Sequence, residues 1–278
     1  MMKYPEINTF RTKESHGIYT FDPFPEKSHP VLLLHGLGAS GISWQMQFEA
    51  LREAGYRPIS PDIPGFGKSH WAKNGWSFNQ VLSCMVDWIA SLEINSFSVV
   101  GLSMGGVFAQ QLAILLPHQI EAAILVNTFA RLRPKNLSQI AYFLQRFFIA
   151  NFISVDRQAE IVAQRIFPRT DQGWLRTEAI REICNTDPAV YRAAMRDLAF
   201  IDLRKELYRI TAPVLVVSGS EDTTISFSDQ KDLVHSIKGA QHIIIQGTGH
   251  ALPVEKPDLF NEYMIKFLSQ FTGSTCVG

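Results

Sequence analysis

The stretch SVVGLSMGGV, residues 98–107, contains the pattern Gly-x-Ser-x-Gly between a β-branched run and a segment of helical composition. A strand that turns sharply into a helix lifts the serine at the turn out of the sheet and exposes its hydroxyl oxygen. Gly101 and Gly105 flank Ser103 because side chains at these positions would crowd the close approach of strand and helix. The helix would direct its unpaired amides and the positive end of its dipole at charge that develops beside the serine. The stretch therefore predicts an exposed nucleophile.

The composition describes a chain that can bury a large core and has no bias toward charged partners. It has 278 residues, of which 46% are hydrophobic, which is enough for one domain or for a domain with an insertion. The 26 basic and 26 acidic residues are mixed along the chain without a basic block. This balance argues against nucleic acid or an anionic membrane surface as the main partner.

Cysteine usage and the first residues indicate the compartment. Cys84, Cys184 and Cys276 are odd in number, far apart and without Cys-x-x-Cys spacing. This pattern disfavours a disulfide framework or a zinc site and favours a reducing compartment. The opening residues MMKYPE are polar, and no run of 18 apolar residues exists, so neither a signal peptide nor a membrane span is expected. We therefore expect a cytoplasmic protein.

Short apolar runs alternate with segments of helical periodicity over most of the chain. The run Val31–Leu34 is continuously apolar, as in a strand that is buried on both faces of a parallel sheet. The alternation predicts a parallel sheet with helices on both faces. Its expected strands lie near residues 31–35, 57–60, 96–100, 122–126, 213–218 and 241–245, preceded by a shorter apolar run from about residue 17. Its expected helices lie near residues 44–54, 78–92, 104–116, 228–237 and 257–271. Sites in such sheets lie at the carboxyl ends of the strands, where His35, Asp62, Ser103 and Asn127 fall.

The alternation stops at about Arg131 and resumes at Pro213. We therefore predict an α/β core of residues 1–130 and 207–278, with a helical cap, or lid, inserted as residues 131–206. The cap contains a stripe of large apolar residues, namely Ile140, Phe143, Leu144, Phe147 and Phe148, followed by Trp174, Ile180, Ile183 and Met195. Two interpretations stay open: the stripe attaches the insertion to the core, or it lines an apolar pocket under a lid.

A serine hydroxyl needs a base to act as a nucleophile at neutral pH, and eight histidines compete for this role. His250 is favoured because it follows a predicted strand end in a short glycine-containing loop. His35 precedes the serine, and the others lie in polar loops, after a helix end or inside predicted elements. The base in turn needs a carboxylate that fixes its tautomer, and Glu221 and Asp222 both follow the strand at 213–218. The chain order serine, acid, histidine belongs to one fold among those that carry such a triad.

With these residues in place, the sequence resembles the α/β-hydrolase family. The resemblance rests on motifs in register outside the insertion, namely HGLG at 35–38, DIPGFGKS at 62–69, GLSMG at 101–105, Gly219-x-x-Asp222, and Gly249-His250 with Glu255-x-Pro257. It implies the α/β-hydrolase fold: a mostly parallel central sheet flanked by helices, with a helical cap inserted after the sixth core strand.

The resemblance also implies a catalytic triad and an oxyanion hole. It assigns the nucleophile to Ser103, the base to His250, the acid to Asp222, and the oxyanion-hole backbone amides to Leu37 and Met104. Some family members carry the acid after the sixth strand, where this chain has an asparagine, which supports the assigned acid. The DIPGFG turn is expected to be structural, with its aspartate bonded to nearby amides.

A serine at this turn indicates acyl transfer to water, since dehalogenases and epoxide hydrolases that resemble this chain use a carboxylate there. We expect a serine hydrolase that cleaves a small to medium carboxylic ester with an apolar portion, without a metal or an organic cofactor. The main alternative is a C–C-bond hydrolase or an enol-lactonase of aromatic degradation, and thioesters, other lactones and peracid formation stay open. A hypothesis of a different class is a hydrolase-like ligand receptor or signalling protein. Fold and triad do not determine the substrate.

Overall fold

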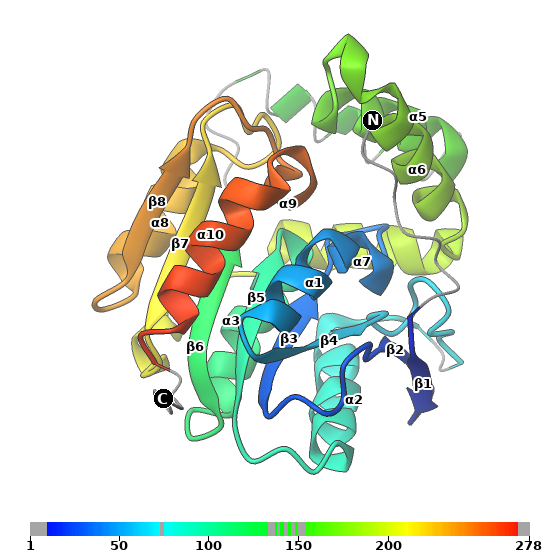
Figure 1. Ribbon diagram of the computed structural model, residues 1–278. Helices are drawn as coiled ribbons and strands as arrows, with labels where there is room; N and C mark the ends of the chain where they lie inside the picture. Colours follow the sequence, from blue (N-terminus) through cyan, green and yellow to red (C-terminus); the bar gives the residue numbers. More distant parts are fainter. Residues whose placement is uncertain are drawn as a thin grey trace.

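The computed structural model describes residues 10–72, 75–132 and 154–271, together with residues 137, 140, 141, 144, 145, 148 and 149. Eight strands form one sheet in the order β1-β2-β4-β3-β5-β6-β7-β8 (Figure 1). From β3 onward the neighbouring strands are parallel, whereas β1 and β2 extend one edge in antiparallel orientation. The strands are β1 (Thr12–Ser15), β2 (Ile18–Phe21), β3 (His29–Leu34), β4 (Tyr56–Pro61), β5 (Phe97–Leu102), β6 (Ile120–Val126), β7 (Val214–Gly219) and β8 (Gln241–Ile245).

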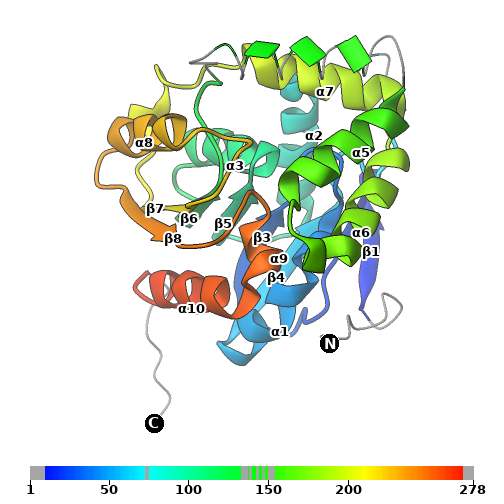
Figure 2. The same cartoon turned by 90° about the horizontal axis from the view of Figure 1, so that it is seen from above.

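Helices cover both faces of this sheet (Figure 2). The elements that flank the sheet are η2 (Gly41–Trp44), α1 (Gln45–Glu53), α2 (Phe78–Ser91), α3 (Met104–Leu115), η4 (Leu207–Arg209), α8 (Phe227–Ser236), α9 (Leu252–Glu255) and α10 (Pro257–Leu268). Alternate strand residues serve the two faces: Leu32 and Leu34 pack in the core with α2 and α3, whereas Val31 and Leu33 pack with α1 and α10. Burial on both faces explains why β3 is apolar without interruption.

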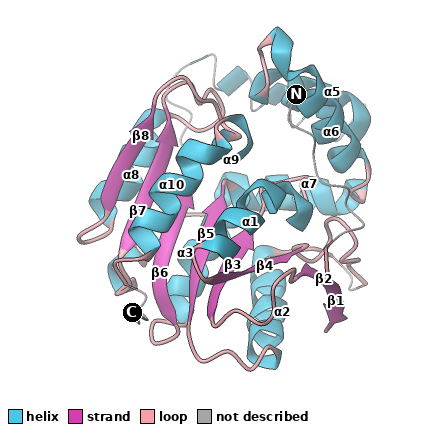
Figure 3. Cartoon of the chain, in the orientation of Figure 1, coloured by secondary structure: helices cyan, strands magenta, loops and turns pink. Residues whose placement is uncertain are grey.

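The predicted parallel sheet with helices on both faces is confirmed. Each strand that the sequence predicts lies within two residues of the observed bounds. The hairpin strand β1 was not predicted. Its sequence, TKES, is polar and has no apolar periodicity, because the strand is largely exposed. The parallel strands all end on the side of the molecule where α5 and α6 lie (Figure 3).

The chain between β6 and β7 contains α5 (Val155–Ile166), η3 (Thr170–Gln172), α6 (Gly173–Cys184) and α7 (Pro188–Phe200). It leaves and re-enters the sheet region at one place, because Arg131 and Asp202 form an isolated antiparallel bridge and an ion pair of 3.5 Å. The buried side chains of α7 join the apolar core that contains α2 and α3. We call this segment the cap; its boundaries at residues 131 and 206 stay a prediction.

Within the part of the chain that the structure describes, no helix is both long and apolar enough to cross a membrane. In the same residues, no group of three or more His, Cys, Asp or Glu side chains converges as metal ligands. Cys84 and Cys184 form no disulfide, and Cys276 lies outside the described residues.

Candidate active site

Ser103 stands at the turn between β5 and α3, as its sequence context predicts. Its backbone has φ +54° and ψ −113°, a strained conformation for a residue with a side chain, which costs on the order of 1–3 kcal/mol. Surrounding hydrogen bonds hold this conformation: the Ser103 amide donates to the Val126 carbonyl at 3.0 Å, and the Thr128 hydroxyl donates to the Ser103 carbonyl at 2.7 Å. The strain therefore serves to present the serine side chain.

The two glycines that flank the serine are required by close backbone contacts. A Cβ atom at Gly101 would lie 2.3 Å from the Gly105 carbonyl oxygen, and one at Gly105 would lie 2.0 Å from the Leu34 carbonyl oxygen. Real Cβ contacts are never this short, and backbone atoms in the middle of a sheet cannot move away. The glycines of the Gly-x-Ser-x-Gly pattern thus allow α3 to pack directly on β3 and β5.

His250 and Asp222 lie on the loops that follow β8 and β7. The Nδ1 atom of His250 is 3.0 Å from Oδ2 of Asp222, and their side chains are only 7% and 1% exposed. The other carboxylate oxygen, Oδ1, accepts hydrogen bonds from the amides of Thr224 and Ile225 at 2.7 and 3.1 Å. Glu221, the alternative carboxylate, is exposed. The structure therefore pairs the histidine with Asp222.

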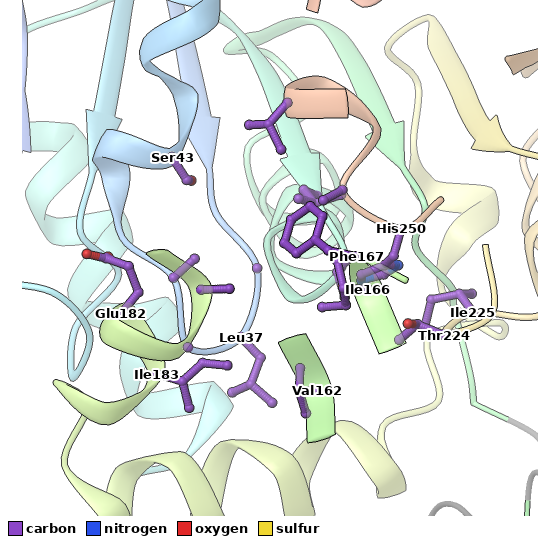
Figure 4. A pocket seen from close by; sticks show the side chains of 18 of the residues that line it. Leu37, Ser43, Val162, Ile166, Phe167, Glu182, Ile183, Thr224, Ile225 and His250 are labelled. Carbon is purple, nitrogen blue, oxygen red and sulfur yellow. The ribbon is translucent and has the colours of Figure 1, made fainter. Parts of the chain in front are cut away.

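Ser103 and His250 line one cavity of about 1180 Å³. The cavity lies between the carboxyl ends of the strands and the cap (Figure 4), and Leu37 of the HGLG loop also faces it. Among the described residues, no acceptor is bonded to the backbone amides of Leu37 or Met104, the pair that sequence analysis assigns to an oxyanion hole. Both amides are consequently available to a ligand atom, and their role stays a prediction.

The wall that the cap contributes is mainly apolar. Ile166 and Phe167, at the end of α5, lie beside His250 (Figure 4). Val162 of α5 lines the cavity nearer to Leu37, and Ser43 and Glu182 stand on the opposite side of the cavity from His250. Of the apolar stripe that the sequence suggests, Leu144, Trp174, Ile183 and Met195 line the cavity. Phe143 and Phe147 lie outside the described residues, and Phe148 is 55% exposed and does not line the cavity.

His35, which follows β3, is held away from acid–base chemistry. Its Nε2 atom accepts a hydrogen bond from the Ile63 amide at 2.9 Å, and its Nδ1 atom donates to the Gly36 carbonyl at 2.8 Å. Complete burial lowers the pKa of His35 to about 4, because desolvation disfavours the charged imidazolium. His35 is therefore a neutral residue that joins two loops.

Asp62, which follows β4, has the structural role that the sequence predicts. Its carboxylate accepts hydrogen bonds from the amides of Gly41 and Lys68 at 2.6 and 2.7 Å. Desolvation by burial raises the pKa of Asp62 to about 6, against the opposing effect of these two amides. It organises the turn between β4 and α2 beside the HGLG loop.

Asn127 has a role that sequence analysis missed. Its side-chain nitrogen donates to the carbonyls of Gly249 and His250 at 2.9 and 2.8 Å, and its Oδ1 accepts from the Gly219 amide at 2.8 Å. It thereby ties the loop of the acid to the loop of the histidine. The available signal was its place at the carboxyl end of β6, the strand next to β7 in the sheet.

Comparisons with known proteins agree with this fold. Residues 29–257 match the family described as the alpha/beta hydrolase fold. A protein of Variovorax paradoxus whose name proposes carbamate hydrolysis, RutD, is 28% identical over 255 residues, 88% of this chain and 94% of its own length. The 3-oxoadipate enol-lactonase 2 of Acinetobacter baylyi is 25% identical over 263 residues, 89% of this chain and 92% of its own length.

Among solved structures, the enol-lactonase of Burkholderia xenovorans LB400 is similar with a TM-score of 0.81 and 24% identity, covering 93% of this chain and 100% of that chain. The esterase of Exiguobacterium antarcticum has a TM-score of 0.81 and 22% identity, over 91% of this chain and 95% of that chain. At these identities the likeness to solved structures concerns the fold. The family match covers most of the chain and every strand from β3 to β8. This chain belongs to the alpha/beta hydrolase fold family.

Proposed function

We propose that this hydrolase cleaves a small to medium carboxylic ester with an apolar portion through an acyl-enzyme on Ser103. The observation that carries the proposal is the buried hydrogen bond between Asp222 and His250 beside the cavity that Ser103 also lines. Nucleophile, base and orienting acid are the three groups that such a reaction needs. The large, mainly apolar cavity supports a substrate with an apolar part.

In the proposed reaction, the Ser103 oxygen attacks the ester carbonyl carbon while His250 accepts the hydroxyl proton. The amides of Leu37 and Met104 would donate hydrogen bonds to the oxyanion that forms on the carbonyl oxygen. His250 then protonates the departing alcohol, and the acyl group remains on Ser103. A water molecule, deprotonated by the same histidine, releases the acid and restores the serine.

Asp222 contributes by fixing the histidine. Because its carboxylate accepts the hydrogen bond from Nδ1, the Nε2 atom of His250 is the one left to accept a proton. The negative charge also stabilises the imidazolium that forms in each half-reaction. The amides of Thr224 and Ile225 hold the carboxylate in this orientation.

Enol-lactone hydrolysis is the second candidate, and the 25% identical relative named 3-oxoadipate enol-lactonase 2 favours it. The same serine attack opens a lactone, with the difference that the leaving oxygen stays attached to the acyl group. A hydrolysis screen separates the candidates. It would contain p-nitrophenyl esters of graded chain length, an enol-lactone, a vinylogous diketone and a carbamate, with hydrogen peroxide added in one arm to detect peracid formation.

The test variant is Ser103→Ala, with Ser269→Ala at the far end of α10 as the control. We expect Ser103→Ala to lose about 10⁴-fold or more in kcat on the best ester, as removal of a triad nucleophile does, with an unchanged unfolding temperature. A folded variant with the wild-type rate would refute the assignment. A wild-type protein that turns over no substrate of the screen, or only once, would favour the receptor hypothesis instead.

A further inference from the structure

Glu255, the last residue of α9, is a buried carboxylate that the proposed reaction does not use. Its side chain is 2% exposed. Both of its oxygens lie 3.1 Å from the amide nitrogen of Gly249, the residue directly before His250. A backbone amide that donates to a buried carboxylate makes a strong, charge-assisted hydrogen bond. Glu255 therefore holds the backbone that carries the histidine.

The same carboxylate is also the point at which the cap reaches this loop. Gln172, at the end of η3, donates from Nε2 to Oε2 of Glu255 at 3.2 Å. Arg169, just before η3, has its Nη2 atom 3.6 Å from the same oxygen. Arg169 additionally donates from Nη1 to the Gly247 carbonyl at 3.3 Å. Two cap side chains thus contact the histidine loop through one carboxylate and one backbone carbonyl.

Charge balance at Glu255 depends on these contacts. Burial raises the pKa of Glu255, while the Gly249 amide, the positive charge of Arg169 and the Gln172 amide group act in the opposite direction. A buried carboxylate without such donors would be costly. Arg169 and Gln172 of the cap therefore contribute to stabilising the charged form of Glu255 next to the histidine loop.

The Gly249 peptide is held from both sides. Asn127 donates to its carbonyl from the β6 end, and Glu255 accepts from its amide on the α9 side. Asn127 directly follows β6, so its contact with Gly249 does not involve the cap. Figure 4 shows Ile166 and Phe167, at the end of α5, beside His250. The cap residues that precede η3 and the histidine are thus immediate neighbours.

We propose that Glu255 is a positioning residue that fixes the Gly249–His250 loop and couples it to the cap through Gln172 and Arg169. The inference rests on the proposed function, because it assigns Glu255 an effect on the reaction of Ser103 and His250. Glu255 does not itself line the cavity, so it has no contact with substrate. Its effect should accordingly appear in kcat and leave KM nearly unchanged.

The test is a reciprocal exchange, Glu255→Gln alone and together with Gln172→Glu. In the single variant the charge is lost, and one side-chain oxygen remains where Glu255 has two. Whichever way the new amide group turns, its NH2 group lies next to a donor, either the Gly249 amide or the Gln172 side chain. In the double variant, residue 172 becomes the acceptor and residue 255 the donor. The new carboxylate can still accept from the Arg169 amide, which now donates to Gln172 Oε1 at 3.0 Å, while residue 255 keeps one oxygen for Gly249.

We expect Glu255→Gln to lower kcat on p-nitrophenyl acetate about 10- to 100-fold, the range that a small displacement of a reacting group costs, with KM within about twofold. The double variant should recover most of the lost kcat. Glu262→Gln, an exposed substitution of the same kind on α10, is the matched control and should match the wild type. If Glu255→Gln does not fold, the double variant Arg169→Gln, Gln172→Leu tests the cap contacts alone and should lose kcat about fivefold.

The first measurement is ester hydrolysis by the wild type and by Ser103→Ala. A wild type without turnover that depends on Ser103 would overturn the proposed function itself, and not specifically the role of Glu255. With that turnover present, a folded Glu255→Gln variant with wild-type kcat would overturn the inference. If Glu255→Gln lowers kcat and the added Gln172→Glu substitution does not restore it, the coupling to the cap is overturned. An unchanged kcat in the Arg169→Gln, Gln172→Leu variant would overturn the coupling as well. A loss of thermal stability without a change in kcat would mark Glu255 as purely structural.

Discussion

The sheet and the cap are held together by different kinds of contact. The sheet residues are fixed by parallel backbone ladders and by apolar cores on both faces. The cap has a small apolar cluster of its own, against which Leu37 of the HGLG loop packs. It also reaches the sheet loops through polar side chains, as in the contacts of Glu182 with Ser40 and of Arg169 with Glu255. Of the described helices α5, α6 and α7, α7 alone contributes buried residues to the main core.

This difference separates the chemistry from the choice of substrate. Ser103, Asp222 and His250 all stand on loops after sheet strands, where ladder register determines their positions. The opposite wall of the cavity comes from α5, α6 and α7. Changes in the sheet loops are therefore expected to change the rate of reaction, and changes in the cap wall are expected to change which substrates fit.

The largest effect should come from the acid on the sheet side. Asp222→Asn keeps the size but reverses the hydrogen-bonding sense toward Nδ1 of His250, which leaves the histidine in the wrong tautomer. We expect a loss of about 10⁴-fold in kcat, as in a well-studied triad, and less than about tenfold for Glu221→Gln. Steady-state kinetics of both variants on one ester measures this. A large loss for Glu221→Gln beside a near-normal Asp222→Asn would move the acid one residue upstream.

A second test concerns the stability of the sheet domain in acid. The pKa of His35 is lowered to about 4 in the folded protein, against about 6.5 in an unfolded chain. Between these values the unfolded state binds more protons, so stability rises with pH through this window and is lost as pH falls. The full contribution is about 3 kcal/mol, reached below the folded pKa.

The comparison protein is His35→Gln, which lacks this titration but keeps Asp62. Urea unfolding at several pH values should show a steeper fall of the unfolding free energy from pH 6.5 to 4 in the wild type than in the variant. Equal slopes would show that His35 does not titrate with the expected shift. Because Asp62 is present in both proteins, the difference between the two slopes isolates His35.

The smallest effect should come from the cap wall. Val162→Ala enlarges the cavity at its cap wall, near Leu37, and should move the preferred acyl chain of p-nitrophenyl esters toward greater length. We expect the ratio of long- to short-chain kcat/KM to change about tenfold. Phe148→Ala, at an exposed site that does not line the cavity, should leave this ratio unchanged. A shift in the Phe148 variant with none in the Val162 variant would reverse this assignment of the cap wall.

The sequence predicted those features that depend on local pattern. Apolar runs predicted the buried strands, and the glycines around Ser103 predicted the strand-to-helix turn. Local chemistry did not choose between Glu221 and Asp222, because adjacent residues after a strand offer the same chemistry. The Gly219-x-x-Asp222 motif of the resemblance selected Asp222, which the structure pairs with His250. The exposed, polar β1 carried no periodic signal.

Contacts between polar residues that are far apart in the sequence could not be predicted, because no local pattern indicates them. Asn127 joins the acid and histidine loops through side-chain hydrogen bonds that span more than 90 residues of sequence. Glu255 appeared only as part of a motif, and its partners Arg169 and Gln172 lie in the cap, whose helices carry no recognisable motif. Such contacts depend on how the cap sits on the sheet, which no local pattern encodes.

The role of Ser103 as the nucleophile is tested most directly by stoichiometric labelling with a p-nitrophenyl alkylphosphonate. The reagent forms a covalent bond with an activated serine oxygen and expels p-nitrophenolate, so the coloured product counts the reactive serines. We predict one equivalent of p-nitrophenolate per chain, loss of esterase activity in step with its release, and a phosphonyl group on Ser103 by peptide mass spectrometry. Ser103→Ala should release none. An active protein that loses activity through a label on any other residue, or keeps full activity with Ser103 phosphonylated, would contradict the assignment of Ser103 as the nucleophile.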